Sequence, residues 1–195
     1  MLIPNPAATL TNAITIDTPA ARIWPWLVQM GSGRAGWYSY DRVDNDGHRS
    51  ATEIIPSLQA VVPGMLFPSL PGATSSFILA RVEPEHDLIL TVPDSGGGLL
   101  VSWEFLLEPS SPSSTRLVVR GRVSSQWPAG GSEPPPPSPR PIERLYALLA
   151  SFPRWLMGPA AMLGHGVMQA RQLRGIKQRA EAGALPARAL DGQGR

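Results

Sequence analysis

The chain has 195 residues, enough for one domain with a substantial core. Apolar residues make up 43% of the sequence and charged residues only 16%, which excludes an intrinsically disordered chain. There is no cysteine, so disulfides, thiol chemistry and cysteine-ligated metal centres are excluded. The net charge of +2 conceals two unlike parts, since residues 1–139 sum to −4 and residues 140–195 to +6. The basic residues of the second part recur at helical intervals, which predicts a solvated helix face and no nucleic-acid partner.

The sequence shows no signal for export or membrane insertion. Met1 to Leu10 contain neither a basic cluster nor a continuous apolar stretch. The longest uncharged run, Ile54 to Ala80, is broken by prolines and glycines, so it predicts short strands with turns and no spanning helix. We therefore expect a cytoplasmic protein.

A strand over Leu10–Asp17 is the first element expected. A helix should follow, with Thr18 as its N-cap and Pro19 as its first helical residue, because proline lacks the N–H that would be unpaired there. This helix should continue to about Met30, with a kink at Pro25.

Two segments match ligand-binding patterns incompletely. The motif Gly31-x-Gly33-x-x-Gly36 has the spacing of a dinucleotide fingerprint, but it follows a helix where the mechanism requires a strand. We interpret these glycines as a tight turn. Asp44 and Asp46 fit a calcium loop whose first ligand position holds Arg42, a cation. We expect no metal and no cofactor.

Alternating apolar residues predict an antiparallel meander with one apolar face. Its main strands are expected at residues 76–82, 88–92, 99–108 and 116–124. Trp103 and Phe105 belong to the apolar face, whereas Glu104 and Arg120 should form a cross-strand ion pair on the outer face.

The C-terminal part should add a proline-rich linker, helices and a tail to a single domain over residues 1–183. We predict the linker over 126–141, an extra apolar helix over 142–157, a last helix over Pro159–Ala182 and a disordered tail over 184–195.

One stripe of the last helix mixes polar and apolar residues. It contains Met162, His165, Gln169, Gln172, Leu173, Ile176 and Ala180. An unpaired buried amide costs about 1–3 kcal/mol, so polar groups on a buried stripe favour a cavity or wet pocket. The alternative is that His165 and Gln169 pair with nearby backbone.

The segments 19–31 and 33–41 resemble the N-terminal signature of bacterial SRPBCC proteins, the START-like superfamily that includes polyketide cyclases and lipid-transfer proteins. Residues 173–181 resemble the end of the last helix in the same subfamily. The resemblance implies an α+β helix-grip fold, in which a curved antiparallel sheet of six to seven strands wraps around a long C-terminal helix, with two short N-terminal helices. It also implies an apolar cavity between sheet and helix.

We expect this cavity to bind a hydrophobic small molecule as a carrier or sensor. The ligand-binding residues expected are Trp37, Tyr38, Tyr40, Trp103, Phe105, Met162, His165, Gln169 and Gln172. The alternative for Trp37, Tyr38 and Tyr40 is that they pack the first helices onto the sheet. A second hypothesis is a cyclase or dehydratase in which His165 is the general acid or base. A third is peripheral membrane contact through residues 142–156, and the sequence leaves the oligomeric state open.

Overall fold

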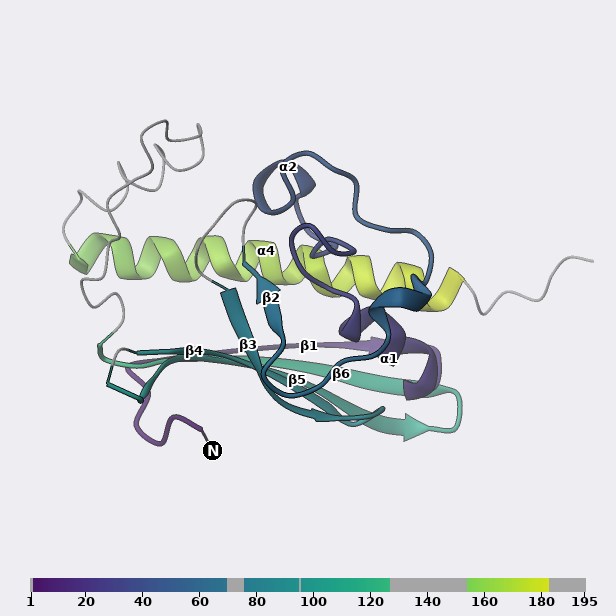
Figure 1. Cartoon of the computed structure of the whole chain (residues 1–195), viewed down its shortest axis with the longest axis horizontal. Coiled ribbons are helices and arrows are strands. Elements are labelled where there is room, and N and C mark those ends of the chain that lie inside the picture. The colour runs from purple at the N-terminus through teal and green to yellow at the C-terminus, as the bar shows by residue number, and fades with distance from the viewer. Residues whose placement is uncertain (1, 70–75, 95, 127–153, 183–195) are drawn as a thin grey trace, which may run out of the picture.

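A computed structural model describes residues 2–69, 76–94, 96–126 and 154–182, with backbone only from 154 to 162. Figure 1 shows a single sheet with one long helix lying across it. The strands are β1 (Ala8–Ile16), β2 (Leu66–Pro68), β3 (Ser76–Glu83), β4 (Asp87–Pro93), β5 (Leu99–Ser111) and β6 (Ser114–Val123). The helices are α1 (Ala20–Val28), α2 (Asp41–Asp44), the short 3₁₀ helix η1 (Pro56–Leu58) and α4 (Arg154–Ala182).

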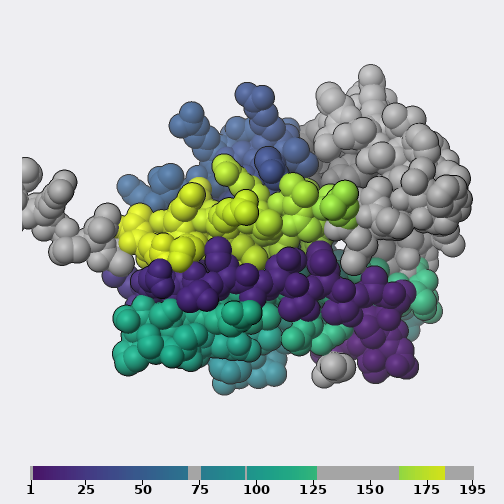
Figure 2. All heavy atoms as spheres, turned by 180° about the vertical axis from the view of Figure 1, so that it is seen from behind, coloured from purple at the N-terminus to yellow at the C-terminus, as the bar shows by residue number. Residues whose placement is uncertain are grey.

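The six strands form one antiparallel sheet in the order β1-β6-β5-β4-β3-β2. Helix α4 covers one face of this sheet and lies along β1, as the view from behind shows (Figure 2). Lys177 fixes the C-terminal half of the helix there, since its Nζ donates to the Thr15 carbonyl oxygen over 2.8 Å. The structure therefore confirms the α+β helix-grip fold.

The core lies between the sheet, α1 and α4. Its fully buried side chains include Ile23 and Leu27 of α1, Phe105 and Leu107 of β5, and Ile176 of α4. The predicted inner stripe of the last helix is confirmed from residue 169 to residue 180, because its members are buried while Arg171 and Arg174 are exposed.

The outer face of the sheet carries charged residues, as the alternation in β5 and β6 predicts. Arg120 Nη1 lies 3.9 Å from Glu104 Oε2, which confirms the cross-strand pair. Arg122 is the nearer partner of Glu104, and both side chains are almost completely buried. The N-terminal segment before β1, which includes the buried Ile3, lies on this side of the sheet (Figure 1).

Three helix boundaries differ from the expected ones. Pro19, with φ −62° and ψ 154°, is the N-cap of α1, and its extended backbone moves the start of the helix to Ala20. Thr18 does not cap the helix; its carbonyl oxygen instead accepts a hydrogen bond from Thr115 Oγ1. Helix α1 ends at Val28 and not near Met30, and α4 begins at Arg154, before the expected start at Pro159.

The glycine motif forms the tight turn that the sequence predicts. Gly31, Gly33 and Gly36 all have positive φ values, and the backbones of Gly31 and Gly36 pair with each other. A Cβ on Gly36 would lie 2.3 Å from Ser50 Oγ, so this position also requires glycine for close approach.

Several sequence predictions fall on residues outside the described ranges. These are the linker over 126–141 beyond its first residue, the apolar helix over 142–157 as far as residue 153, and the tail over 184–195. Residues 154–157, expected at the end of that apolar helix, instead form the start of α4. Within the described part of the chain, no helix combines the length and apolar character that crossing a bilayer requires.

Candidate functional site

Five rings meet between the sheet and α4, and we call them the ring cluster: Trp37, Phe77, Trp103, Phe105 and His165. Trp103 is at the centre, with ring centroids 5.3 Å from Trp37, 5.3 Å from Phe77 and 4.9 Å from Phe105. The ring of His165 meets Trp103 edge to face at 5.9 Å. Residues 103 and 105 share the inner face of β5 because side chains alternate along a strand. The chain thus brings rings from four separate segments together.

Burial decreases from one end of the ring cluster to the other. Phe105 is completely buried and Trp37 is 4% exposed, so both belong to the core. Phe77 and Trp103 are only half-buried, and His165 is exposed. The cluster therefore has a closed inner end and an outer end that keeps ring surface accessible.

The glutamines of the helix stripe are paired with other side chains. Trp103 Nε1 donates to Gln169 Oε1 over 3.0 Å, and Gln169 Nε2 donates to Gln172 Oε1 over 2.7 Å. Gln172 Nε2 then donates to the Met30 sulfur at 3.6 Å. We call this chain of hydrogen bonds the polar relay. It offsets most of the free-energy cost of burying the two glutamine amides. Their presence on the stripe therefore does not require a water-filled cavity, although the partners are not the nearby backbone groups considered above.

His165 lies at the accessible end of the ring cluster. It is an exposed residue, yet its ring lies against Trp103, and the loss of water there lowers the pKa of the imidazole. A hydrogen bond with Gln169 opposes this effect and is the smaller of the two. The neutral imidazole is therefore favoured near neutral pH, which is the form that can accept a proton.

Tyr38 and Tyr40 lie apart from the ring cluster. Tyr38 is buried, with its ring edge-to-face to Trp26, and its hydroxyl donates to the Trp26 carbonyl oxygen and accepts from Gln29 Nε2. These contacts support the alternative in which Tyr38 packs α1 onto the domain. Tyr40 is 44% exposed on the loop before α2, and the side chain of Met162 lies outside the described residues.

Sequence reasoning did not select two residues that shape the cluster. Phe77 of β3 contacts both Trp37 and Trp103. The alternation of apolar residues along this strand is the sequence pattern that could have placed Phe77 on the inner face. Gly121 is the cross-strand partner of Trp103, and a Cβ there would lie 4.0 Å from His165 Nε2. The absent side chain leaves room for the imidazole over β6.

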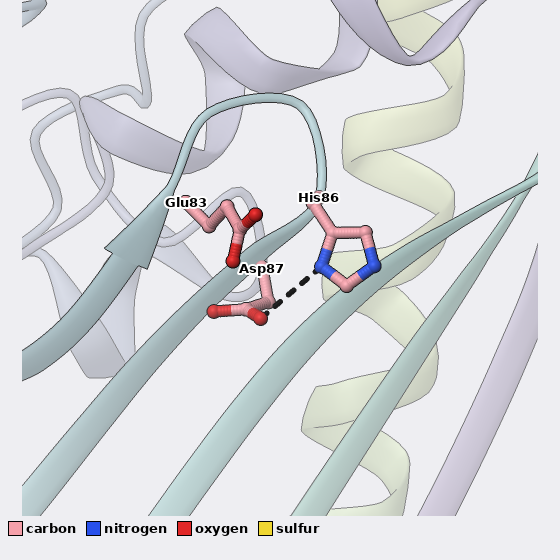
Figure 3. Close-up of side chains that lie close together, drawn as sticks. All are labelled: Glu83, His86 and Asp87. Atoms are coloured by element: carbon pink, nitrogen blue, oxygen red, sulfur yellow. Dashed lines mark hydrogen bonds and ion pairs between the residues drawn. The ribbon is translucent and has the colours of Figure 1, made fainter.

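A separate group of possible metal ligands lies at the β3–β4 turn (Figure 3). Ligand atoms of Glu83, His86 and Asp87 all lie within 4.8 Å of one another. However, Arg81 Nη2 lies 2.8 Å from Glu83 Oε2 and 3.1 Å from Asp87 Oδ2. Because this guanidinium already balances the carboxylates, we interpret the group as an ion-pair network that closes the turn.

Comparison with known proteins gives only structural likenesses, since no protein-family model and no curated protein matches the sequence. Solved structures similar to the chain include the polyketide-cyclase-like protein of Corynebacterium glutamicum, with TM-score 0.49, 14% identity, and 97% and 100% of the two chains covered. They also include an aromatase/cyclase of a Streptomyces species, with TM-score 0.46, 14% identity, and coverage of 94% and 99%. A protein of Mesorhizobium loti matches with TM-score 0.46, 16% identity, and coverage of 91% and 100%.

Proposed function

We propose that the chain binds a hydrophobic small molecule at the outer end of the ring cluster and acts as its carrier or sensor. The observation that carries this proposal is the graded burial of the rings: Phe105 is closed off, whereas Trp103 and Phe77 keep part of their surface accessible. A lipid, a polyketide-like compound or an aromatic compound that covers these rings removes apolar surface from water. Aromatic rings also offer offset and edge-to-face contacts to a planar ligand.

The polar relay supports this role because it holds the central ring in place. The indole of Trp103 is fixed by its hydrogen bond to Gln169, and Gln169 is fixed in turn by Gln172. A ring that is already ordered loses little conformational entropy when a ligand binds to it. The arrangement is therefore suited to binding.

A carrier or sensor fits the described residues of the ring cluster better than an enzyme does. His165 is the one titratable group among the five rings, so no second acid or base accompanies it there. Gln169 uses its oxygen for Trp103, one amide N–H for Gln172 and a further hydrogen bond with His165, so it is held within the polar relay.

The second candidate is a cyclase-type enzyme in which His165 moves the proton. The observation in its favour is the neutral imidazole at the accessible end of the cluster. Replacement of His165 by alanine tests this candidate. The variant should lose turnover of a confirmed substrate, and unchanged turnover would exclude His165 as the acid or base.

The binding proposal is tested with the uncharged fluorescent probe N-phenylnaphthylamine. We expect Trp103→Ala to weaken probe binding about tenfold, a loss of roughly 1.4 kcal/mol. Trp24→Ala is the matched control, because Trp24 is a half-buried tryptophan on α1 outside the ring cluster. Equal affinities for wild type and Trp103→Ala would overturn the proposal, as would equal losses in both variants. If Trp103→Ala does not fold, Trp103→Leu replaces it.

A further inference from the structure

A small polar hollow lies between α4 and the chain segment that leads into α2. Figure 1 shows α2 beside the long helix. Its volume is about 80 Å³, and its lining includes Ser39, Asp41, Arg171, Gly175, Gln178 and Arg179. Gly175 brings helix and loop together, because a Cβ there would lie 2.2 Å from the Tyr38 carbonyl oxygen. None of the five rings of the ring cluster lines this hollow.

Arg179 forms one wall of the hollow and is held rigidly. Its Nε donates to the Ala51 carbonyl oxygen over 2.7 Å and its Nη1 to the Gly175 carbonyl oxygen over 3.0 Å. Its Nη2 makes a long contact of 3.5 Å with the Ser50 carbonyl oxygen, and its guanidinium carbon lies 4.7 Å from the centre of the Tyr38 ring. A guanidinium has five N–H donors, so two remain for a further acceptor.

Positive charge in the hollow exceeds negative charge. Arg171 and Arg179 both line it, and Asp41 is the one carboxylate among the lining residues. Asp41 Oδ1 already accepts a hydrogen bond from Ser50 Oγ at 2.5 Å. Within the described part of the chain, no ion pair joins a carboxylate to either arginine. Burial lowers the pKa of Arg179, the nearby Tyr38 and Asp41 oppose this effect, and repulsion from Arg171 adds a smaller lowering.

We propose that this hollow binds an oxyanion of phosphate type, which bridges Arg171 and the free N–H groups of Arg179. Two guanidinium groups offer the planar paired donors that phosphate oxygens accept. Gln178, exposed on the same wall, supplies a further amide donor. The polar lining and the small volume suit a phosphate-sized group and exclude a large hydrophobic ligand.

The test measures binding of inorganic phosphate by calorimetry to the full chain. We expect Arg171→Gln to weaken phosphate binding about tenfold, which corresponds to roughly 1.4 kcal/mol. Arg174→Gln is the matched control, because Arg174 is an exposed arginine on the same helix that does not line the hollow. Arg174→Gln should bind as the wild type does. An undetectable wild-type affinity, or equal affinities in the two variants, would overturn the proposal.

A second experiment distinguishes two sources of the phosphate group, a lipid headgroup and a free anion. Leu163 and Val167, eight and four residues before Arg171, are 72% and 51% exposed, so apolar surface adjoins the hollow along α4. Co-sedimentation with phosphatidylcholine vesicles, with and without phosphatidic acid, therefore accompanies the calorimetry. Binding to the acidic vesicles that Arg171→Gln abolishes identifies a lipid headgroup, whereas binding of inorganic phosphate alone identifies a free anion. The uncharged probe of the ring cluster reports separately on the proposed function.

Discussion

Trp103 Nε1 donates a hydrogen bond to Gln169 Oε1 over 3.0 Å, and this bond joins β5 to α4 across the interface between sheet and helix. It fixes the most central ring of the cluster and also satisfies a buried amide. The same contact therefore connects the packing of the last helix to the surface that we propose for ligand binding.

Replacement of Gln169 by leucine should reduce stability and ligand affinity together. The change leaves the Trp103 indole N–H and the Gln172 oxygen without their partners, which costs about 1–3 kcal/mol. Urea unfolding measures the first effect and titration with N-phenylnaphthylamine the second. Gln178→Leu, at an exposed position of the same helix, should change the unfolding free energy by no more than about 0.5 kcal/mol. Equal effects in the two variants would contradict the role of the relay.

Two glycines of α4 should respond oppositely to alanine. Gly175→Ala places a Cβ 2.2 Å from the Tyr38 carbonyl oxygen, so helix or loop must move, at a cost of about 1–3 kcal/mol. A Cβ on Gly164 meets nothing within 4 Å, so Gly164→Ala should gain up to about 1 kcal/mol of helix propensity. Thermal and urea unfolding of both variants measure the difference. A neutral Gly175→Ala would show that the close approach to Tyr38 is not rigid.

His165 should make stability depend on pH in the mildly acidic range. Because partial burial lowers its pKa in the folded state, the unfolded chain binds a proton more readily. The stabilisation from neutral His165 is complete above about pH 6.5, the ordinary pKa of histidine, and is lost as the pH falls through the lower folded-state pKa. Measured from about pH 8 to pH 5, the unfolding free energy of the wild type should therefore fall more steeply on acidification than that of His165→Gln. Parallel curves would contradict this assignment.

On the outer face of the sheet, Arg122 should matter far more than Arg120. Both contact Glu104, but the Arg122 side chain is 5% exposed and the Arg120 side chain 34%. Arg122→Leu leaves Glu104 buried without its near partner, at a cost of about 3–5 kcal/mol. Arg120→Leu removes a longer, partly exposed contact and should cost less than about 1 kcal/mol. Urea unfolding of the two variants measures the difference, and Arg122→Leu should have the lower midpoint.

The strands and the helix stripe were predictable because both depend on short-range periodicity. The alternation in β5 placed Trp103 and Phe105 on one face, and helical spacing placed Gln169 and Gln172 on the buried side of α4. The hydrogen bonds that join these side chains were not predictable, because the last of them depends on the position of Met30, which is distant in the sequence.

Contacts between distant segments explain the predictions that failed. Thr18 has the chemistry of an N-cap, but its backbone is bound to the start of β6, so Pro19 caps the helix. Gln29 has no sequence signal, yet its side chain binds Tyr38, Glu53, Ile55 and Gln59 and thereby fixes the segment after α2. Tyr38 is therefore buried in the core, which agrees with the packing alternative that the sequence left open beside a ligand role.

Indole N–H signals in a two-dimensional nitrogen–proton NMR spectrum offer the most direct test of ligand binding at the ring cluster. The chain has six tryptophans, and titration with N-phenylnaphthylamine should shift the Nε1–H signals of Trp103 and Trp37 first. Those of Trp24 and Trp26 should stay in place, because α1 lies outside the ring cluster. If the signals of Trp103 and Trp37 do not move, or all indole signals move together, the ring cluster is core packing and the binding proposal is wrong.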